Sequence, residues 1–423
     1  VHPPEMKLTE EKDIIDPPLP EKLILHLKQH IGKPAVPIVG VGDEVSIYQK
    51  IAESDDFVSA AVHSPVKGKV VSIEAYPHPD GKDETAIIIE PNKEQPTPDS
   101  HGKRPSPDKI IKKIQDAGIV GLGGAMFPTH VKLSIPKDKS IDTLIINGAE
   151  CEPYLTADSR LMQEDPDGIV SGIKLILNVL KVKKAMIGIE KNKPAAIKSM
   201  KDSTKDEKLI RVNPLPTRYP QGGEKVLIKK LTGREVPSSG LPLDIGVVVI
   251  NVGTALAIHE AVYHGKPLVE RIITITGDVK EPCNLRAKIG TPIEHLIKHA
   301  GGYSGMPKKI LCGGPMMGIS QDTDKASIIK GNNAILVFNA KRSDILYPDD
   351  EEPCIRCGKC VGACPANLSP TTIMRYSKKN KFGFAKANFA MDCFECGCCS
   401  YICPSKIDLV GWIKIAKSEI SRL

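Results

Sequence analysis

The sequence has few aromatic residues and no long apolar run. Phe, Trp and Tyr make up 4% of its 423 residues, although a hydrophobic content of 41% and a charged content of 26% are ordinary for a folded chain. The most apolar stretch, residues 246–258, is interrupted by Asn251, Gly253 and Thr254, and it is shorter than the roughly 18 residues of a membrane-spanning helix. The first residues lack the apolar core of a secretion signal. We therefore expect a globular chain of about two to four domains, without a transmembrane helix or a secretion signal.

The charge pattern also lacks the features of a nucleic-acid-binding protein. The net charge is +7, from 58 basic and 51 acidic residues, and the lysines are scattered along the whole length. Because no arginine-rich stretch is interleaved with aromatic residues, we expect no nucleic-acid binding. A mild positive charge suits an acidic protein partner or an anionic membrane face.

The cysteines, by contrast, are concentrated. Nine of the twelve lie between Cys354 and Cys403, and the other three are Cys151, Cys283 and Cys312. A secreted disulfide-stabilised domain would spread its cysteines through a small chain. With no export signal we expect reduced thiols, and the crowded tail indicates a metal site.

The spacing of these cysteines indicates which metal group they bind. The pattern C-x2-C-x2-C-x3-C-P occurs twice, 39 residues apart, and ends at Pro365 and at Pro404. In two-cluster ferredoxins the first three cysteines of each copy bind one cube, and the fourth binds the other cube. The pattern thus predicts one 4Fe-4S cluster on Cys354, Cys357, Cys360 and Cys403, and a second on Cys393, Cys396, Cys399 and Cys364. Two zinc sites would explain neither Cys-Pro pair. Cys398 is out of pattern and is expected to be a small buried side chain.

A glycine-rich segment, residues 121–129 (GLGGAMFPT), precedes Lys132. It differs from the dinucleotide-binding fingerprint, because Met126 stands at the third glycine position and residues 108–117 have a helical pattern where a strand is required. Bare backbone amides in such a loop can approach a phosphate or a planar ring, and Lys132 can neutralise an anion. A tight turn between two elements is the alternative interpretation.

The central part of the sequence alternates between strand and helix patterns. Strands are expected at residues 143–146, 185–190 and 247–251, and helices at 169–180, 194–200, 224–230 and 254–263. This alternation predicts an α/β domain with a mostly parallel sheet. Ligands bind at the carboxyl ends of such strands, which are the loops 147–152 and 251–254.

The flanking regions have different patterns. Residues 32–90 read as short strands, at 36–39, 45–47, 58–61, 68–73 and 86–90, and residues 271–338 read as a small α+β unit. We expect a multidomain α/β and α+β protein with an N-terminal domain over 1–90, a linker over 91–107, an α/β domain over 108–269, a domain over 270–340 and a two-cluster domain over 345–423. Apolar residues at helical spacing in 408–423 predict a helix that covers the cluster region, and docking on membrane-embedded partner subunits is the alternative.

Four segments of the chain resemble the NADH-oxidising flavoprotein subunit of respiratory complex I. They are residues 121–129, 147–153 (NGAECEP), 219–224 (YPQGGE) and 251–254 (NVGT). The resemblance implies FMN on the glycine loop with NADH stacked on the flavin. It also implies that the cofactor-binding residues are Gly121, Gly123, Gly124, Lys132, Asn147, Glu150, Gly222, Gly223, Glu224, Asn251 and Thr254. Hydride transfer itself requires no acid or base, so no catalytic base is predicted. Ala149 and Ile135 depart from the family pattern near the nucleotide site.

The order of the domains resembles the C subunit of Rnf-type ferredoxin:NAD oxidoreductase complexes. Residues 63–68 resemble a lipoyl-type barrel-sandwich domain, but the hairpin tip at 54–56 has no lysine for lipoate or biotin. Residues 272–338 resemble a β-grasp (SLBB) domain. The resemblance implies a peripheral subunit on the cytoplasmic side of the cell membrane, with membrane-embedded and iron–sulfur partner subunits, that exchanges electrons between NAD(H) and ferredoxin while the complex transports ions. FMN would divide the electron pair of NADH between one-electron clusters.

Two other interpretations fit part of the pattern. A microcompartment-type cobalamin reductase shares the flavin, β-grasp and cluster domains, but about 107 residues precede the glycine loop in this chain. A non-catalytic electron-relay subunit that does not bind a nucleotide is the second alternative. Flavin content and bleaching by NADH distinguish an enzyme from such a relay.

Overall fold

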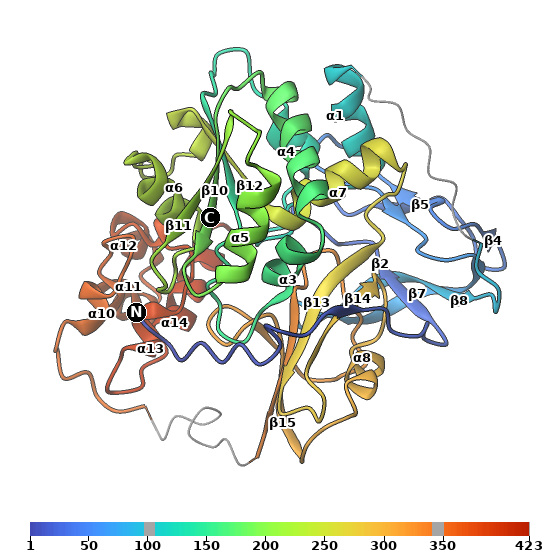
Figure 1. The fold of residues 1–423 in the computed structure, drawn as a ribbon. Coiled ribbons are helices and arrows are strands. Elements are labelled where there is room, and N and C mark those ends of the chain that lie inside the picture. The colour runs from blue at the N-terminus through green and yellow to red at the C-terminus, as the bar shows by residue number, and fades with distance from the viewer. Residues whose placement is uncertain (97–105, 341–350, 423) are drawn as a thin grey trace.

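The computed structural model describes residues 1–96, 106–340 and 351–422. Figure 1 shows a central α/β region flanked by the N-terminal β-sheets, by a larger mixed sheet and by the C-terminal helices. Most of the expected linker and the start of the expected cluster domain therefore lie outside the described residues.

The N-terminal region contains two small sheets that share one core. The four-stranded sheet consists of β2 (Leu23–His26), β8 (Lys82–Pro91), β7 (Gly68–His78) and β4 (Glu44–Val45). The three-stranded sheet consists of β3 (Val36–Pro37), β5 (Lys50–Glu53) and β6 (Val62–His63). The strand expected at 58–61 is wrong: β6 begins at Val62, and the Ala60 amide donates instead to the His30 Nε2 atom at 2.8 Å.

The central sheet is parallel throughout, as the alternating pattern predicted. Its order is β11 (Ile210–Leu215), β10 (Ala185–Glu190), β9 (Thr143–Asn147) and β12 (Val247–Asn251). Leu144 and Ile146 pack into the core shared with α1, α4 and α7, whereas Ile145 packs with Leu227 of α6 on the opposite face. Both faces are covered, which is why these strands are continuous apolar runs.

Helices α3 to α6 lie in the connections between the strands of this sheet, whereas α1 and α2 precede its first strand and α7 follows its last. Figure 1 shows α6 on one side of the sheet and α4, α5 and α7 on the other. Their bounds are α1 (Pro107–Asp116), α2 (Thr129–Leu133), α3 (Ala157–Glu164), α4 (Pro166–Leu180), α5 (Pro194–Ser203), α6 (Glu224–Thr232), η1 (Pro242–Ile245) and α7 (Val252–Tyr263).

A six-stranded mixed sheet follows, and its edge strand comes from the N-terminal segment. The order is β1 (Ile14–Ile15), β14 (Cys283–Lys288), β13 (Glu270–Gly277), β17 (Ala334–Asn339), β15 (Pro307–Cys312) and β16 (Ile319–Gln321), with α8 (Ile293–His299) packed on it. Because β1 pairs in parallel with β14, residues 1–15 run past the central domain before the N-terminal sheets begin.

The C-terminal region is helical and is an internal repeat. Its elements are α10 (Lys359–Gly362), α11 (Pro370–Ser377), α12 (Phe382–Ala387), η2 (Ala390–Asp392), α13 (Cys398–Tyr401) and α14 (Leu409–Ile420). The first residues of α10 and α13 are 39 positions apart, and so are those of α11 and α14. Helix α14 buries Leu409, Ile413, Ala416 and Ile420 against this region, which confirms the predicted covering helix.

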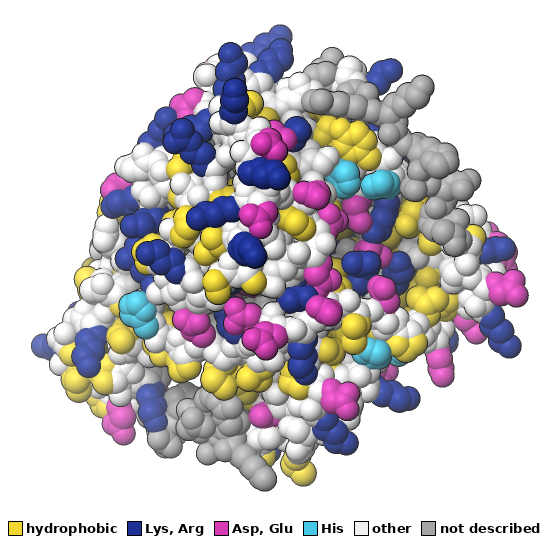
Figure 2. Space-filling view, in the orientation of Figure 1, with side chains coloured by type: hydrophobic (Ala, Val, Ile, Leu, Met, Phe, Trp, Pro, Cys, Tyr) yellow, Lys and Arg dark blue, Asp and Glu magenta, His cyan; other side chains and the backbone are white. Residues whose placement is uncertain are grey.

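The surface carries charges of both signs. On the face in Figure 2, Lys and Arg side chains are interspersed with Asp and Glu. Among the helices of the described residues, none is both long and apolar enough to span a bilayer.

Candidate functional site

The glycine loop joins α1 to α2 and is closed by a backbone hydrogen bond from the Gly121 amide to the Phe127 carbonyl, at 2.9 Å. Its buried anchor is Leu122. The Leu122 amide donates to Thr254 Oγ1 at 2.9 Å, and its carbonyl accepts from Arg271 Nη2 at 3.2 Å. These contacts fix the base of the loop, while its tip, Gly123 to Ala125, is exposed.

Two glycines at the tip lack side chains for different reasons. A Cβ atom added to Gly123 would lie 3.0 Å from Asn251 Cβ and 3.1 Å from Asn251 Nδ2, so a side chain here would crowd Asn251 and force it to shift. A Cβ atom added to Gly124 would meet no atom within 4 Å. The backbone at Gly124 therefore borders open space, as a backbone cradle for a bound phosphate or ring would.

Asn147 and Asn251 lie side by side at the carboxyl edge of the parallel sheet. They end β9 and β12, which pair in register at these two residues. Asn251 Oδ1 accepts from the Gly253 amide at 2.8 Å and so caps α7. Asn147 Nδ2 donates to the Gly222 carbonyl at 2.9 Å. The expected ligand loops thus meet the glycine loop at one edge of the sheet.

Lys132 and Glu224 connect the glycine loop to α6. Lys132 Nζ lies 2.9 Å from Glu224 Oε1, and the two side chains are 30% and 42% exposed. An anion that binds Lys132 must therefore compete with the Glu224 carboxylate. Such a half-exposed pair is weak, contributing about 1 kcal/mol or less.

Glu150 binds backbone amides at the start of α3. Its Oε1 atom accepts from the Asp158 amide at 2.7 Å, and its Oε2 atom accepts from the Ser159 amide at 3.1 Å. Both oxygens thus cap the first turn of α3. Glu150 therefore shapes the site by positioning α3 rather than by presenting an unpaired carboxylate.

Three functional neighbours were missed in the sequence. Asp158 Oδ2 accepts from Asn251 Nδ2 at 2.7 Å, and burial, with the nearby Glu150 charge, raises the pKa of Asp158 to about 6. Arg271 is buried, which lowers its pKa to about 10 despite the Asp158 charge nearby. Arg271 follows Glu270 at the start of β13, where two adjacent charged residues give no sequence signal of a buried polar network.

The third missed residue is Lys7 of the N-terminal segment. Its ammonium donates to the carbonyls of Glu150, Glu152 and Leu155, at 3.0, 2.8 and 2.7 Å. Burial lowers the pKa of Lys7 to about 8, and the Lys193 charge contributes in the same direction. Lys7 thereby fixes the loop between β9 and α3.

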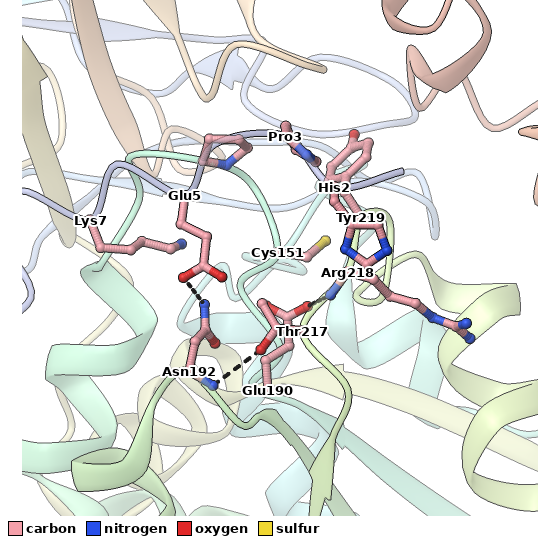
Figure 3. Close-up of a pocket in the computed structure, with 11 residues that line it drawn as sticks. His2, Pro3, Glu5, Lys7, Cys151, Glu190, Asn192, Thr217, Arg218 and Tyr219 are labelled. Atoms are coloured by element: carbon pink, nitrogen blue, oxygen red, sulfur yellow. Dashed lines mark hydrogen bonds between the residues drawn. The ribbon is translucent and has the colours of Figure 1, made fainter.

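A small cavity lies beside Lys7 at the carboxyl ends of β10 and β11. Figure 3 shows the N-terminal segment crossing one side of it, with Asn192 Nδ2 donating to Glu5 Oε2 at 3.0 Å. On the other side the Arg218 amide donates to Glu190 Oε1 at 3.1 Å. The cavity measures about 60 Å³, which holds a few water molecules and is too small for a nucleotide.

The repeated cysteines form two neighbouring groups. Burial raises the pKa of Cys360, and the nearby Cys403 and Cys357 raise it further. Burial raises the pKa of Cys399 to about 12, and the nearby Cys393, Cys396 and Cys364 raise it further. In both groups the fourth cysteine of one repeat joins cysteines of the other, which is the crossed arrangement that the spacing predicts.

The backbone around the cysteines repeats as well. Positive φ angles occur at three pairs of positions 39 residues apart: Arg356 (55°) and Glu395 (59°), Gly358 (72°) and Gly397 (76°), and Asn367 (55°) and Lys406 (51°). Such conformations turn successive amides toward one concave side, which suits an anionic iron–sulfur cluster.

Two backbone amides already point at cysteine sulfurs. The Leu368 amide donates to Cys364 Sγ, and the Glu395 amide donates to Cys393 Sγ, both at 3.4 Å. Among the described residues, no three His, Cys, Asp or Glu side chains converge as ligands of one metal ion. A cube needs a wider arrangement, because each thiolate binds a separate iron.

The two cysteine groups differ in their surroundings. Cys396 and Cys398 pack with Tyr219, Cys151, Met316 and Phe394 at the boundary with the central domain. Cys354 and Cys357 are exposed. Cys398 is 1% exposed, as expected for a small buried side chain.

Phe394 links the second repeat to the ligand loops. A Cβ atom added to Gly223 would lie 3.3 Å from Phe394 Cε2. The adjacent Gly222 is held by Asn147, at the edge of the sheet where the glycine loop lies. The second cysteine group therefore lies one aromatic ring away from the loop that borders the predicted flavin site.

Four family profiles match consecutive parts of the chain. Residues 1–94 match the RnfC barrel sandwich hybrid domain, residues 114–260 the Nuo51 FMN-binding domain, residues 272–320 the SLBB domain and residues 347–404 the 4Fe-4S dicluster domain. The predicted fold class is thus confirmed, including the barrel-sandwich domain at the N-terminus.

Solved structures share the fold. Two structures of an NAD⁺-reducing [NiFe]-hydrogenase, in the H2-reduced and the air-oxidised state, align with TM-scores of 0.52 and 0.50. They are 18% and 20% identical, and each alignment covers 75% of this chain and 62% or 55% of that chain. At this identity the likeness concerns the fold alone.

Several relatives match almost the whole chain. It is 46% identical to the C subunit of the proton-translocating ferredoxin:NAD(+) oxidoreductase complex of Clostridium ljungdahlii, over 99% of this chain and 93% of the relative. It is 45% identical to the Na(+)-translocating counterpart of Acetobacterium woodii, over 99% and 96%. It is 41% identical to the C subunit of the ion-translocating oxidoreductase complex of Rhodobacter capsulatus, over 88% and 72%. The chain belongs to the family of the C subunits of Rnf-type, ion-translocating ferredoxin:NAD oxidoreductase complexes.

Proposed function

We propose that this protein is the NAD(H)-reacting subunit of an ion-translocating ferredoxin:NAD oxidoreductase. It holds FMN on the glycine loop and two 4Fe-4S clusters on the repeated cysteines. FMN supplies hydride exchange with NAD(H) and single-electron exchange with the clusters. The relatives' names and the FMN-binding and dicluster profiles support this assignment.

The glycine loop and its surroundings fit FMN in three respects. Its exposed tip borders open space at Gly124, where a side chain would occupy the volume needed by a ligand. Helix α7 begins beside this tip, and its N-terminal partial positive charge favours an anion such as a phosphate. Lys132 adds a positive charge, which now pairs with Glu224 and would pair with the phosphate when FMN binds.

The packing supports a fixed order for the clusters. The observation that carries this order is the contact of Gly223 with Phe394, which brings the repeat containing Cys393, Cys396 and Cys399 against the ligand loops. We infer that this inner cluster exchanges electrons with the flavin site. The outer cluster, on Cys354, Cys357, Cys360 and Cys403, exchanges electrons with a partner, because two of its ligands are exposed.

The partners and the location follow from family membership. We propose that the outer cluster faces iron–sulfur and membrane-embedded subunits of the same complex, on the cytoplasmic side of the membrane, and that ferredoxin is the remote electron donor or acceptor. We propose no nucleic-acid partner, because the lysines are scattered along the sequence without an arginine-rich stretch.

Anaerobically purified full-length protein tests the assignment. We expect about one FMN and about eight irons and eight sulfides per chain, with flavin absorbance bleached by NADH. Zinc in place of iron after full reconstitution would overturn the cluster assignment. Stoichiometric FMN that NADH leaves oxidised would favour an electron-relay subunit that does not react with nucleotide.

A further inference from the structure

Lys417 lies directly against the inner cysteine group. Its ammonium donates to the Cys393 carbonyl at 2.7 Å and to Glu395 Oε1 at 2.5 Å. The side chains of Lys417 and Glu395 are only 22% and 31% exposed. A positive and a negative charge therefore flank Cys393, and both are partly shielded from water.

Helix α14 gives Lys417 this position. The helix buries Ile413, Ala416 and Ile420 in the same core that contacts Cys393 and Cys364. Lys417 follows Ala416 on the side of the helix that faces the cysteines. The lysine stem is thereby ordered, so its ammonium is a fixed charge beside the second repeat rather than a mobile surface charge.

The internal repeat supplies a natural comparison. The residue 39 positions before Lys417 is Lys378, at the end of α11. Lys378 pairs with Glu351 at 2.5 Å and lies over the Trp412 ring, with its Nζ atom 5.2 Å from the ring centroid. The equivalent lysine of the first repeat thus makes a different set of contacts.

We propose that Lys417, balanced by Glu395, sets the reduction potential of the inner cluster. The inference rests on the proposed function, because it requires a cluster on Cys393. One-electron reduction of a cluster adds one negative charge and breaks no bond. A fixed cation beside the ligand Cys393 stabilises the reduced state, and an adjacent carboxylate stabilises the oxidised state. Lys417 is a positioning residue, since it acts through Cys393 and its field.

Opposite charge changes should therefore move the potential in opposite directions. Lys417→Met leaves Glu395 unpaired beside the cluster and should lower the midpoint potential. Glu395→Gln leaves Lys417 unpaired and should raise it. We expect each to change the reduction equilibrium about tenfold, which corresponds to about 59 mV for a one-electron couple. Lys417→Arg keeps the charge and should restore a value close to that of the wild type.

The test is an anaerobic redox titration of the full chain, followed by low-temperature electron paramagnetic resonance. Cys357→Ser provides a background without the outer cluster, so that the remaining signal belongs to the inner one. Lys378→Met is the matched control, because it removes the equivalent lysine of the first repeat and should leave the inner potential unchanged.

The outcomes separate this inference from the proposed function. Absence of any cluster signal in reconstituted wild-type protein would contradict the proposed function itself. The role of Lys417 would be overturned if both variants, Lys417→Met and Glu395→Gln, contain the inner cluster at full occupancy and its midpoint potential equals that of the wild type. It would also be overturned if the two midpoint potentials move in the same direction. If Lys417→Met fails to bind its cluster, the upward shift in Glu395→Gln decides the question.

Discussion

Gly124→Val is the sharpest perturbation of the predicted flavin site. In the protein itself an added Cβ atom at Gly124 meets no atom within 4 Å, and its φ angle is not in the left-handed region. The fold should therefore tolerate valine. A ligand seated on the loop would instead collide with the new side chain, because the bare backbone is the surface that it needs.

The size of the effect follows from the contacts that the ligand would lose. Displacement from the loop breaks one or two hydrogen bonds between backbone amides and an anionic ligand, each contributing about 1.5–3 kcal/mol. A total of about 3 kcal/mol corresponds to a roughly 100-fold rise in the dissociation constant of FMN. The melting temperature of the flavin-free protein should change little, since the variant creates neither a cavity nor an internal clash.

Quenching of flavin fluorescence during titration of flavin-free protein measures this constant. Gly383→Val is the matched control, because Gly383 in α12 also has no atom within 4 Å of an added Cβ. It should leave FMN binding unchanged. Wild-type FMN affinity in Gly124→Val would refute the reasoning and locate the flavin elsewhere.

Three further predictions concern the clusters, the anion site and a buried lysine. Cys357→Ser should lose about four of the eight irons, while Cys398→Ser should retain both clusters, as measured by iron and sulfide assays. Lys132→Ala should weaken FMN binding about tenfold, and added FMN should partly restore NADH oxidation; unchanged affinity would mean that the Glu224 pair is only structural. Burial lowers the pKa of Lys330 to about 7, below its unfolded value of 10.5, so between these pH values the unfolded chain binds more protons than the folded one. The free energy of unfolding of the wild type relative to that of Lys330→Met should therefore rise with pH across this window, at up to about 1.4 kcal/mol per pH unit. Anaerobic melting curves of both proteins at pH 7 and 9 test this, and an equal difference in melting temperature at the two pH values would contradict it.

Lys330 also illustrates what the sequence could not reveal. Its ammonium donates to the carbonyls of Ala61 and Gly118, at 2.6 and 2.7 Å, and thereby joins three regions of the chain. Nothing in its sequence neighbourhood distinguishes it from a surface lysine. Contacts between residues far apart in the sequence, such as the network of Asp158, Asn251 and Arg271, leave no periodic pattern either.

Strands that read as continuous apolar runs were predictable, and polar elements were not. The bounds of β10 and β12 agree with the sequence because both strands are apolar and almost fully buried, although β12 lies at an edge of the sheet. Strand β11 was missed: it lies at the sheet edge and includes Arg211, Asn213 and Pro214. Helix α3 was missed because its sequence, ADSRLMQE, is largely polar and its first turn is capped by Glu150 from the preceding loop rather than by a residue at its own N-terminus.

The grouping of the cysteines was predictable, because the repeated spacing brings the fourth cysteine of each copy beside the other copy. That each group binds a 4Fe-4S cluster stays a prediction. The different surroundings of the two groups could not be predicted, because they depend on the packing of Phe394 against Gly223 and of Tyr219 near Cys396. The order of the two clusters relative to the flavin site is therefore an inference from tertiary structure.

The order of the two clusters is the central claim and can be measured directly. Cys357→Ser and Cys396→Ser each remove one cluster, and rapid freeze-quenching after mixing with NADH records which remaining cluster is reduced. We predict that NADH reduces the inner cluster of Cys357→Ser at nearly the wild-type rate. In Cys396→Ser, NADH should reduce FMN but leave the outer cluster oxidised over the time in which the inner cluster is reduced in the wild type. Reduction of the outer cluster at the wild-type rate in Cys396→Ser would contradict the account.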